Sequence, residues 1–465
     1  MAAHTMVPDA PSSPGPAVRG PKGLPILGNT LAFARDPLGF FERTAREYGD
    51  VVRLNFAGWP TLLLSDQTGI EKVLVKESRN FIKNEVMWRQ VRALFGTGLL
   101  TSEGELWQRQ RKLAAPAFAG AQLIGYGPDI VKLSEQEVST WEDGPEVDIH
   151  ANMMRMTLNI AAKAFFDSEV PKDIADVGEA LDVLAHVLTS RFKRPILIPD
   201  SLPIPSNIGY NRAIRTVETI VRRMIEERRR TGLEGRTDFL SRFMAARDES
   251  GQPMSDQQLR DEAVTLLLAG HETTALTLSW SLHLLGTHPE VQARLADEIE
   301  LALGSRSVTT DDLPQLKLAE GVVMEAMRLY PPAWMLGRQA LGEFEIAGHT
   351  FGPGTTVFIA PLVLHKDPRY FDDPLAFRPE RWLDGTLARS LPRFAYMPFG
   401  GGPRICVGQR FAMMSATMML ATIVRSWQVT RLPHRPVTPY PSITLRPEGG
   451  VWVRLARRQG AGNRG

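Results

Sequence analysis

The sequence contains a single cysteine, Cys406, among its 465 residues. One thiol cannot form a disulfide within the chain, so the fold depends on its core, and this usage fits a reducing compartment such as the cytoplasm. A strong excess of charge is also missing, because the net charge is +2 and 23% of the residues are charged. Such a small net charge gives no reason to expect a nucleic-acid partner, and we expect a cytoplasmic protein.

The sequence also lacks a long uninterrupted apolar segment. Its first twenty residues are rich in Pro, Ala, Ser and Gly and contain no apolar run typical of a signal peptide or anchor. Residues 1–20 are therefore predicted to be a flexible tail, and residues 21–465 a single domain. The most apolar later stretch, residues 263–285, has His271 and Glu272 near its centre. Because charge is costly in lipid, this stretch is predicted to be a buried helix.

Helical spacing of apolar residues dominates the rest of the chain. Two segments, at residues 49–66 and 344–361, are instead rich in β-branched and aromatic residues around glycine and proline, which indicates small sheets. The predicted fold is therefore mainly α with small peripheral β-sheets. The predicted helices lie at residues 107–118, 147–166, 217–230, 259–285, 288–303 and 318–330.

The one cysteine lies in the segment FGGGPRICVG, residues 399–408. Glycines at 400–402 let a bulky flat group approach the backbone, and Arg404 offers a fork of donors that matches a carboxylate. The helix-like run that follows places Cys406 near a helix N-terminus, where a thiolate is favoured. This pattern leaves open a buried thiol, a cysteine nucleophile or a thiolate ligand of haem iron. A phosphate-binding loop is excluded, because no Lys-Ser/Thr follows the glycines.

Phe399, Gly402, Arg404, Cys406 and Gly408 resemble, position by position, the haem-binding signature of the cytochrome P450 family. The resemblance implies the fold of that family, with haem between a long central helix and the loop that carries the cysteine. It implies haem b (iron protoporphyrin IX) as the cofactor and the Cys406 thiolate as the ligand of the iron. The other four residues are then expected to belong to the cofactor site.

The centre of the predicted buried helix reads AGHETT, residues 269–274. In an apolar helix a glycine costs about 1 kcal/mol relative to alanine, and a buried carboxylate is costly without partners. A satisfied polar kink would explain such a break. The stretch also resembles the oxygen-activation motif of the same family. That resemblance implies that Gly270 leaves room for dioxygen, that Thr273 hydrogen-bonds the bound oxygen, and that Glu272 connects it to a proton path.

The motif EAMR places Glu325 and Arg328 three positions apart, on one predicted helix face. Such a pair is often only a surface ion pair of little energetic value. The resemblance to the family implies a structural triad instead, with Arg381 as its third member. This triad is expected to fix the coil that leads to the cysteine.

Three further residues are expected near the haem propionates. Trp107 and Arg111, about one helical turn apart, resemble a Trp-x-x-x-Arg pair of the family that contacts a propionate, although an amphipathic basic helix gives the same pattern. Arg338 lies in a region where the family often has another such arginine, although a surface arginine would look the same.

The resemblance implies a haem-thiolate monooxygenase that activates O2 and hydroxylates or epoxidises a hydrophobic small molecule, such as a terpene, fatty acid or steroid. The segments expected to line its pocket are apolar, as such a substrate requires, although core packing also explains them. The pocket candidates are Met87, Phe95, Leu266, Ala269 and Trp334. Two alternatives stay open: a haem-thiolate protein that catalyses a rearrangement without oxygen activation, and a haem-free cysteine-dependent enzyme.

Electrons are expected from outside the chain, because the segment after the cysteine is too short for a flavin domain. The expected donor is a ferredoxin with its ferredoxin reductase, or a similar external protein. Arg109, Lys112 and Arg410 are predicted to form its docking site, since a basic patch attracts an acidic partner. No nucleic acid and no membrane anchor are expected.

Overall fold

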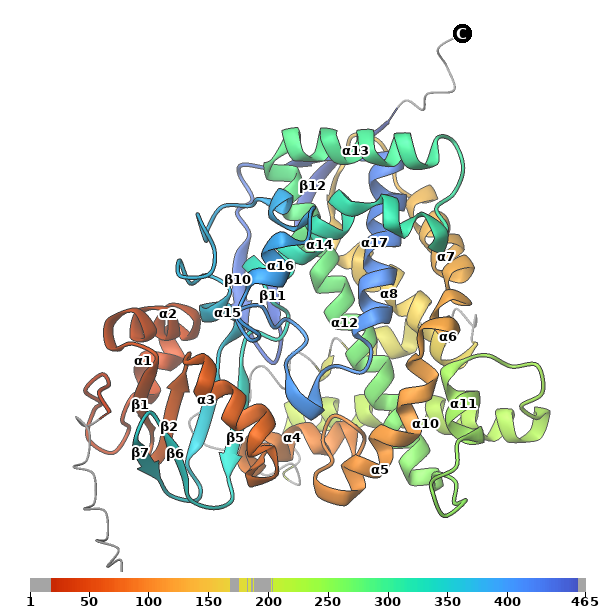
Figure 1. The fold of residues 1–465 in the computed structure, drawn as a ribbon. Helices are drawn as coiled ribbons and strands as arrows, with labels where there is room; N and C mark the ends of the chain where they lie inside the picture. The colour runs from red at the N-terminus through yellow and green to blue at the C-terminus, as the bar shows by residue number, and fades with distance from the viewer. Residues whose placement is uncertain are drawn as a thin grey trace, which may run out of the picture. The chain divides into compact units, whose positions relative to one another are not determined.

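The computed structural model describes residues 18–167, 175–181, 183–184, 187, 202 and 204–458, and the side chains of residues 86, 87, 90 and 121 lie outside this description. The chain divides into two compact units (Figure 1). In its described part the smaller unit comprises residues 18–82 and 337–360, and the larger unit takes up the rest. The single domain expected for residues 21–465 stays a prediction.

A five-stranded sheet with strand order β1-β2-β8-β5-β3 forms the centre of the smaller unit. Its first two strands pair antiparallel through a turn in which Ala57 and Gly58 both have positive φ, the geometry that two-residue hairpins favour. The β segments predicted at residues 49–66 and 344–361 are confirmed. The elements are α1 (Thr30–Arg35), α2 (Pro37–Tyr48), β1 (Val51–Phe56), β2 (Trp59–Leu64), α3 (Gln67–Glu71), β3 (Phe81–Ile82), β5 (Leu336–Ala340), β6 (Phe344–Ile346), β7 (His349–Phe351) and β8 (Thr356–Ile359).

The larger unit is built around α12 (Asp256–Thr287), which is buried along most of its length. The helix begins with a capping box, because the Ser255 hydroxyl accepts from the N–H of Gln258 and the Gln258 side chain accepts from the N–H of Ser255. It ends just before Pro289, where a preceding residue avoids helical angles. The predicted buried helix is confirmed. Of the helices that the structure describes, none combines the length and apolar content needed to cross a membrane.

Helices α8 and α17 lie beside α12 in Figure 1. The predicted helices and the mainly α class are confirmed, with one difference at residue 147. Val147 pairs with Val453 in a three-stranded sheet, and Asp148 caps α8 by accepting from the N–H of His150, so the helix begins two residues later than expected.

Several other elements of this unit, among them α10, α14 and β9, also pack against α12. Its helices are α4 (Glu85–Phe95), α5 (Gly104–Ala114), α6 (Gly120–Ile124), α7 (Gly127–Ser139), α8 (Ile149–Phe166), α10 (Pro205–Thr231), α11 (Phe239–Ala245), α13 (Pro289–Leu303), α14 (Lys317–Leu329), α15 (Pro361–Leu364), α16 (Thr386–Ser390) and α17 (Gln409–Ser426). Its strands are β4 (Glu146–Asp148), β9 (Trp427–Arg431), β10 (Thr438–Pro441), β11 (Leu445–Glu448) and β12 (Trp452–Arg457).

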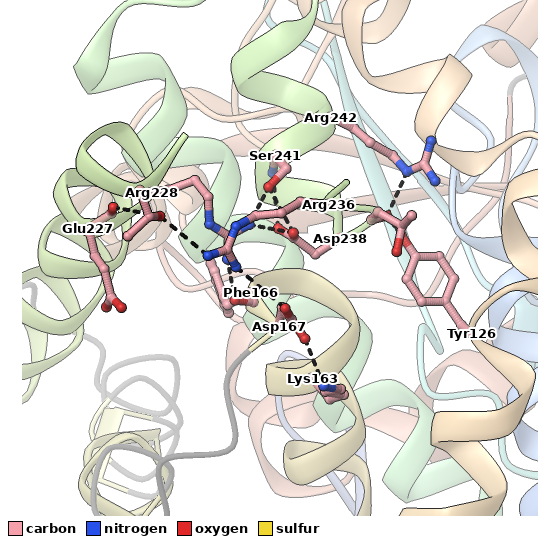
Figure 2. Close-up of polar contacts among 12 residues, drawn as sticks. Tyr126, Lys163, Phe166, Asp167, Glu227, Arg228, Arg236, Asp238, Ser241 and Arg242 are labelled. Atoms are coloured by element: carbon pink, nitrogen blue, oxygen red, sulfur yellow. Dashed lines mark hydrogen bonds and ion pairs between the residues drawn. The ribbon is translucent and has the colours of Figure 1, made fainter. Parts of the chain in front are cut away.

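A buried ion pair joins the ends of three helices (Figure 2). Arg228, in the last turn of α10, pairs with Asp238, the N-cap residue of α11, and with the Ser241 hydroxyl. The same guanidinium donates to the carbonyl oxygen of Phe166 at the end of α8, at 2.8 Å. Both charges are almost fully buried, so removal of either partner would leave the other unpaired in the core.

Candidate active site

The cysteine lies in a tight loop directly before α17. Its backbone N–H donates to the carbonyl oxygen of Phe399 at 3.0 Å, which closes the loop. Gly400 and Gly402 have φ values of 74° and 71°, so the backbone itself requires glycine at these two positions. Gly408 is the N-cap residue of α17, and Cys406 lies two residues before it, within reach of the N–H groups of Gly408 and Gln409.

The Cys406 side chain is exposed, although protein atoms around its sulfur desolvate it on the other sides. This desolvation raises the pKa of the thiol, and the N–H of Gly408, the charge of Arg111 and the N–H of Gln409 oppose that rise. The sulfur therefore has backbone donors and a cation that stabilise a thiolate, and an open side at which an iron ion can bind.

Trp107, Arg111 and Arg404 form one cluster with the cysteine loop. The Arg404 guanidinium lies 4.3 Å from the centroid of the Trp107 ring, donates to the carbonyl oxygen of Ser102 at 2.9 Å, and pairs with Glu103. Burial lowers the pKa of Arg111, and the nearby Cys406 opposes this change. Two partly buried cations beside an aromatic ring are well suited to an anionic group such as a carboxylate.

Arg338 lies in the smaller unit, where its Nη1 donates to the carbonyl oxygen of Gly337 at 2.9 Å. Its expected contact with a propionate stays a prediction.

The helix α12 is continuous at the predicted motif, but it is less buried there. Ala269 is exposed and Gly270, Glu272 and Thr273 are half-buried, whereas the helix is buried on both sides of them. The Thr273 hydroxyl donates to the carbonyl oxygen of Ala269 at 2.7 Å, so it keeps its lone pairs for a further partner. This face of the helix is therefore less covered by protein atoms than the turns on either side of it.

Gly270 lies where α12 packs against α8. A Cβ atom at this position would lie 2.8 Å from the ring of Phe165 on α8, so glycine allows the two helices to pack closely. The Phe165 ring continues through Phe239 to Phe118, with centroids 5.1 and 4.5 Å apart, and Phe118 lies next to Gly408. The motif and the cysteine loop thus contact the same aromatic cluster, and the expected role of Gly270 toward dioxygen stays a prediction.

Glu272 is held by two partners that the sequence did not indicate. Its Oε1 accepts from the Thr444 hydroxyl at 2.5 Å and from Arg446 Nε and Nη2 at 2.8 and 2.6 Å. Burial by itself would raise the pKa of Glu272, but the charge of Arg446 and these hydrogen bonds outweigh it, and the pKa lies below its ordinary value. The neighbouring His271 is buried, which lowers its pKa to about 4 and keeps it neutral.

Glu325, Arg328 and Arg381 come together in one network, in which Glu325 and Arg328 are fully buried and Arg381 is half-buried. Arg328 donates to both carboxylate oxygens of Glu325 at 2.9 and 2.8 Å, and Arg381 Nε donates to Oε1 at 3.0 Å. Trp382 Nε1 and the backbone N–H of Arg378 add donors at 2.9 and 3.0 Å. Arg328 also donates to three backbone carbonyl oxygens of the following coil, those of His365, Pro374 and Ala376. The coil contains little regular secondary structure, and the network satisfies some of its backbone carbonyl oxygens and holds it in place.

The pocket candidates differ in their surroundings. Ala269 is exposed and Leu266 is buried on the same helix, and Phe95 is half-buried. Trp334 is buried, and its Nε1 donates to the carbonyl oxygen of Ser442 at 2.9 Å. The side chain of Met87 lies outside the described residues.

The predicted docking cations are partly engaged within the chain. Arg109 Nε donates to Asp248 at 2.7 Å, and Lys112 pairs with Glu249 at 2.7 Å. A recess of about 460 Å³ opens beside the cysteine loop, and its wall includes Ile405. Docking of a partner near Arg109, Lys112 and Arg410 stays a prediction.

Comparison with known proteins gives consistent matches over most of the chain. The family model for cytochrome P450 matches residues 18–453. Cyclooctatin synthase and cyclooctat-9-en-7-ol 5-monooxygenase of Streptomyces melanosporofaciens are 34% and 36% identical, each over 91% of this chain and 92% of the relative. Pentalenene oxygenase of Streptomyces avermitilis is 33% identical over 98% of this chain and 99% of its own. The crystal structure of the cytochrome P450DA heme domain matches with a TM-score of 0.87 at 26% identity, over 95% of this chain and 97% of that one.

Proposed function

The chain belongs to the cytochrome P450 family and is a monooxygenase with a haem-thiolate cofactor, and from this premise we propose that it hydroxylates or epoxidises a terpenoid. The similarity to the three Streptomyces enzymes carries this choice, because the substrate or product in each of their names is a cyclic terpenoid. The apolar side chains of Leu266, Ala269 and Trp334 suit such a substrate better than a charged one. A terpenoid is therefore favoured within the wider set of terpenes, fatty acids and steroids.

We propose that the cofactor is haem b. Its iron would be held by Cys406 Sγ, which is accessible and receives backbone N–H donors. Arg111 and Arg404 would bind the propionates beside Trp107. The Arg404 guanidinium, which pairs with the Glu103 carboxylate, would then pair with a propionate carboxylate instead. When bound, the haem supplies the activation of O2, and the protein supplies orientation, protons and exclusion of water.

Glu272 and Thr273 are proposed to deliver the protons that the reaction consumes. The lowered pKa of Glu272 keeps it ionised at neutral pH, so its carboxylate can accept a proton. Thr444 and Arg446, which donate hydrogen bonds to Oε1, hold the carboxylate in place. Thr273 Oγ1, whose hydrogen is donated to Ala269, has lone pairs free to accept a hydrogen bond on the open face of α12. Proton transfer between positioned groups of this kind typically contributes a factor of about 10²–10⁴ to the rate.

A ferredoxin with its reductase is the proposed electron source, and the cytoplasm the proposed location, because one unpaired cysteine fits a reducing compartment. Since Arg109 and Lys112 are already paired with Asp248 and Glu249, the acidic partner would have to compete for them. Charge reversal at Arg410 tests this site, and an unchanged electron-transfer rate and salt dependence would exclude it.

The absorption spectrum of the reduced protein with carbon monoxide tests the cofactor proposal. A strongly red-shifted Soret band is expected for the wild type, and it should be lost in the Cys406→Ala variant. A haem band without this shift would show that the cysteine is not the ligand. If haem fails to bind after reconstitution, the haem-thiolate proposal is wrong and a haem-free cysteine enzyme is favoured.

A further inference from the structure

Four buried polar atoms on α12 have no hydrogen-bond partner among the described residues: Arg260 Nε, Glu262 Oε1, Thr265 Oγ1 and His271 Nδ1. Two of them, Glu262 Oε1 and Thr265 Oγ1, belong to neighbouring side chains on the helix. Glu262 is 0% exposed and Thr265 is 4% exposed, so bulk water does not compensate for the missing partners. The two residues are three positions apart and therefore lie on one side of the helix. Buried polar groups without partners are rare and costly, so a pair of them at one place requires an explanation.

The Thr265 hydroxyl differs from every other hydroxyl on α12, all of whose residues the structure describes. The others each donate to the carbonyl oxygen four residues earlier, as hydroxyls in helices commonly do. Those residues are Thr273, Thr274, Thr277, Ser279, Ser281 and Thr287. The Thr265 hydroxyl does not donate to the carbonyl oxygen of Asp261, so it remains available to a partner outside the helix.

The loop of residues 96–99 lies against this side of the helix. Leu99 N–H donates to Glu262 Oε2 at 3.0 Å, and Thr97 donates twice to Asp261 Oδ2, at 2.7 and 3.1 Å. A Cβ atom on Gly98 would lie 2.3 Å from Thr265 Oγ1, so the loop backbone passes directly over that hydroxyl. The loop satisfies one oxygen of Glu262 and covers both side chains, but it gives neither unpartnered atom a hydrogen bond.

The same helical face leads to the open stretch of the active site. Thr265, Ala269 and Thr273 follow one another at intervals of four residues, and Ala269 is exposed. The buried Thr265 hydroxyl is thus one helical turn away from Ala269, which is one of the residues expected to contact the substrate. Beyond Ala269, Thr265 and then Glu262 follow along this face of the helix.

We propose that Glu262 and Thr265 bind a hydroxyl group of the substrate, so that the enzyme acts on a terpenoid that already carries one oxygen atom. This inference rests on the monooxygenase function proposed above and narrows its substrate class. A neutral Glu262 accepts from Leu99 through Oε2 and has a proton on Oε1 to donate. A substrate hydroxyl can accept that proton and donate its own to Thr265 Oγ1, which satisfies both atoms at once.

The protonation of Glu262 follows from its surroundings. Burial raises the pKa of Glu262 to about 8, the N–H of Leu99 opposes this rise, and the nearby Asp261 adds to it. The charge of Asp261 is in turn engaged by Arg260 Nη1 and Gln257 Nε2, both at 2.8 Å. At neutral pH the acid is therefore mostly in the form that donates.

Binding of matched probes to the haem-loaded enzyme tests the inference. Three pairs share a skeleton and differ in one hydroxyl: borneol and bornane, cedrol and cedrane, and androstan-3-ol and androstane. Dissociation constants come from the shift of the haem absorption band on binding. The wild type is expected to bind the alcohol of at least one pair about tenfold more tightly than its hydrocarbon, as two neutral hydrogen bonds warrant.

The variants separate recognition from folding. Thr265→Val removes only an unpartnered hydroxyl, so it should fold normally and reduce the preference to less than about threefold. Glu262→Gln keeps an acceptor for Leu99 and a donor for the ligand, so it should retain the preference, whereas Glu262→Leu should lose it. Thr422→Val removes a buried hydroxyl that is satisfied within α17, and it should leave the preference unchanged.

The proposal is overturned if no alcohol binds, if hydrocarbons bind as tightly as alcohols, or if Thr265→Val keeps the preference. The carbon monoxide spectrum distinguishes this failure from a failure of the proposed function. A protein with the red-shifted band and no preference for alcohols contradicts only the hydroxyl site. A protein that does not bind haem contradicts the function itself.

Discussion

The Glu325→Gln substitution should strongly destabilise the protein, although it changes few atoms. Both Glu325 and Arg328 are 0% exposed, and the carboxylate accepts five hydrogen bonds. A glutamine leaves the buried charge of Arg328 uncompensated and turns an N–H2 group toward other donors. The loss of one partner of a buried ion pair typically costs about 3–5 kcal/mol, and we expect a loss in the free energy of unfolding of that size.

Glu380→Gln provides a matched control, because it makes the same chemical change in an exposed pair. Arg294 and Glu380 form an ion pair with side chains 50% and 37% exposed, and such a pair contributes less than about 1 kcal/mol. Urea unfolding followed by circular dichroism would measure both variants, with refolding checked. The coil that leads to Cys406 depends on the network, so haem uptake should also fall in Glu325→Gln. Equal unfolding midpoints for the two variants would refute the structural role of the triad.

Three further outcomes are expected. Thr273→Ala should lower the product formed per electron pair consumed by about tenfold or more, and unchanged product formation would favour a rearrangement without oxygen activation. Arg446→Gln should raise the pKa of Glu272 and move the acidic limb of the pH dependence of coupled turnover to higher pH. Arg446→Lys keeps the charge and should largely restore the wild-type position of the limb. An unmoved limb in Arg446→Gln would contradict the role of Arg446. Glu262 has a pKa raised from 4.5 to about 8, so its neutral form stabilises the fold at low pH. As the pH rises from 4.5 toward 8, the free energy of unfolding should fall by up to about 1.4 kcal/mol per pH unit. Unfolding measured at several pH values should show a smaller slope in Glu262→Gln than in the wild type. Equal slopes in the two proteins would mean that Glu262 is ionised throughout this range.

The parts of the fold that local sequence controls were predictable. The helix α12 is apolar on nearly all sides, and residues 58–60, with a glycine and a proline, lie between two β-rich runs as a turn signal, so both elements were recognisable without tertiary information. Strand β4 was missed, because its three residues become a strand only through pairing with β12, about 300 positions later. Local propensity contains no information about such a partner.

In the site too, features that depend on local sequence were predictable and features that depend on distant partners were not. The cysteine loop was recognisable through its resemblance to the family signature, because its residues alone left a buried thiol and a nucleophile open. The contact between Arg404 and the Trp107 ring was not predicted. The partners of Glu272 were not predictable, because Thr444 and Arg446 lie in a short hairpin with no motif of its own. The neighbour of Gly270 was also not evident, since the reason for glycine there lies on another helix, at Phe165.

The network around Glu325 and Arg328 has a consequence for the order of assembly. Synthesis proceeds from the N-terminus, so α14 leaves the ribosome before the coil that Arg328 binds, and that coil before Cys406. Until the coil arrives, Glu325 and Arg328 have only each other as partners from this network. The carbonyl oxygens of His365, Pro374 and Ala376 then find a preformed receptor on the helix. Cys406, the proposed haem ligand, thus follows both the helix and the coil of this network in the order of synthesis.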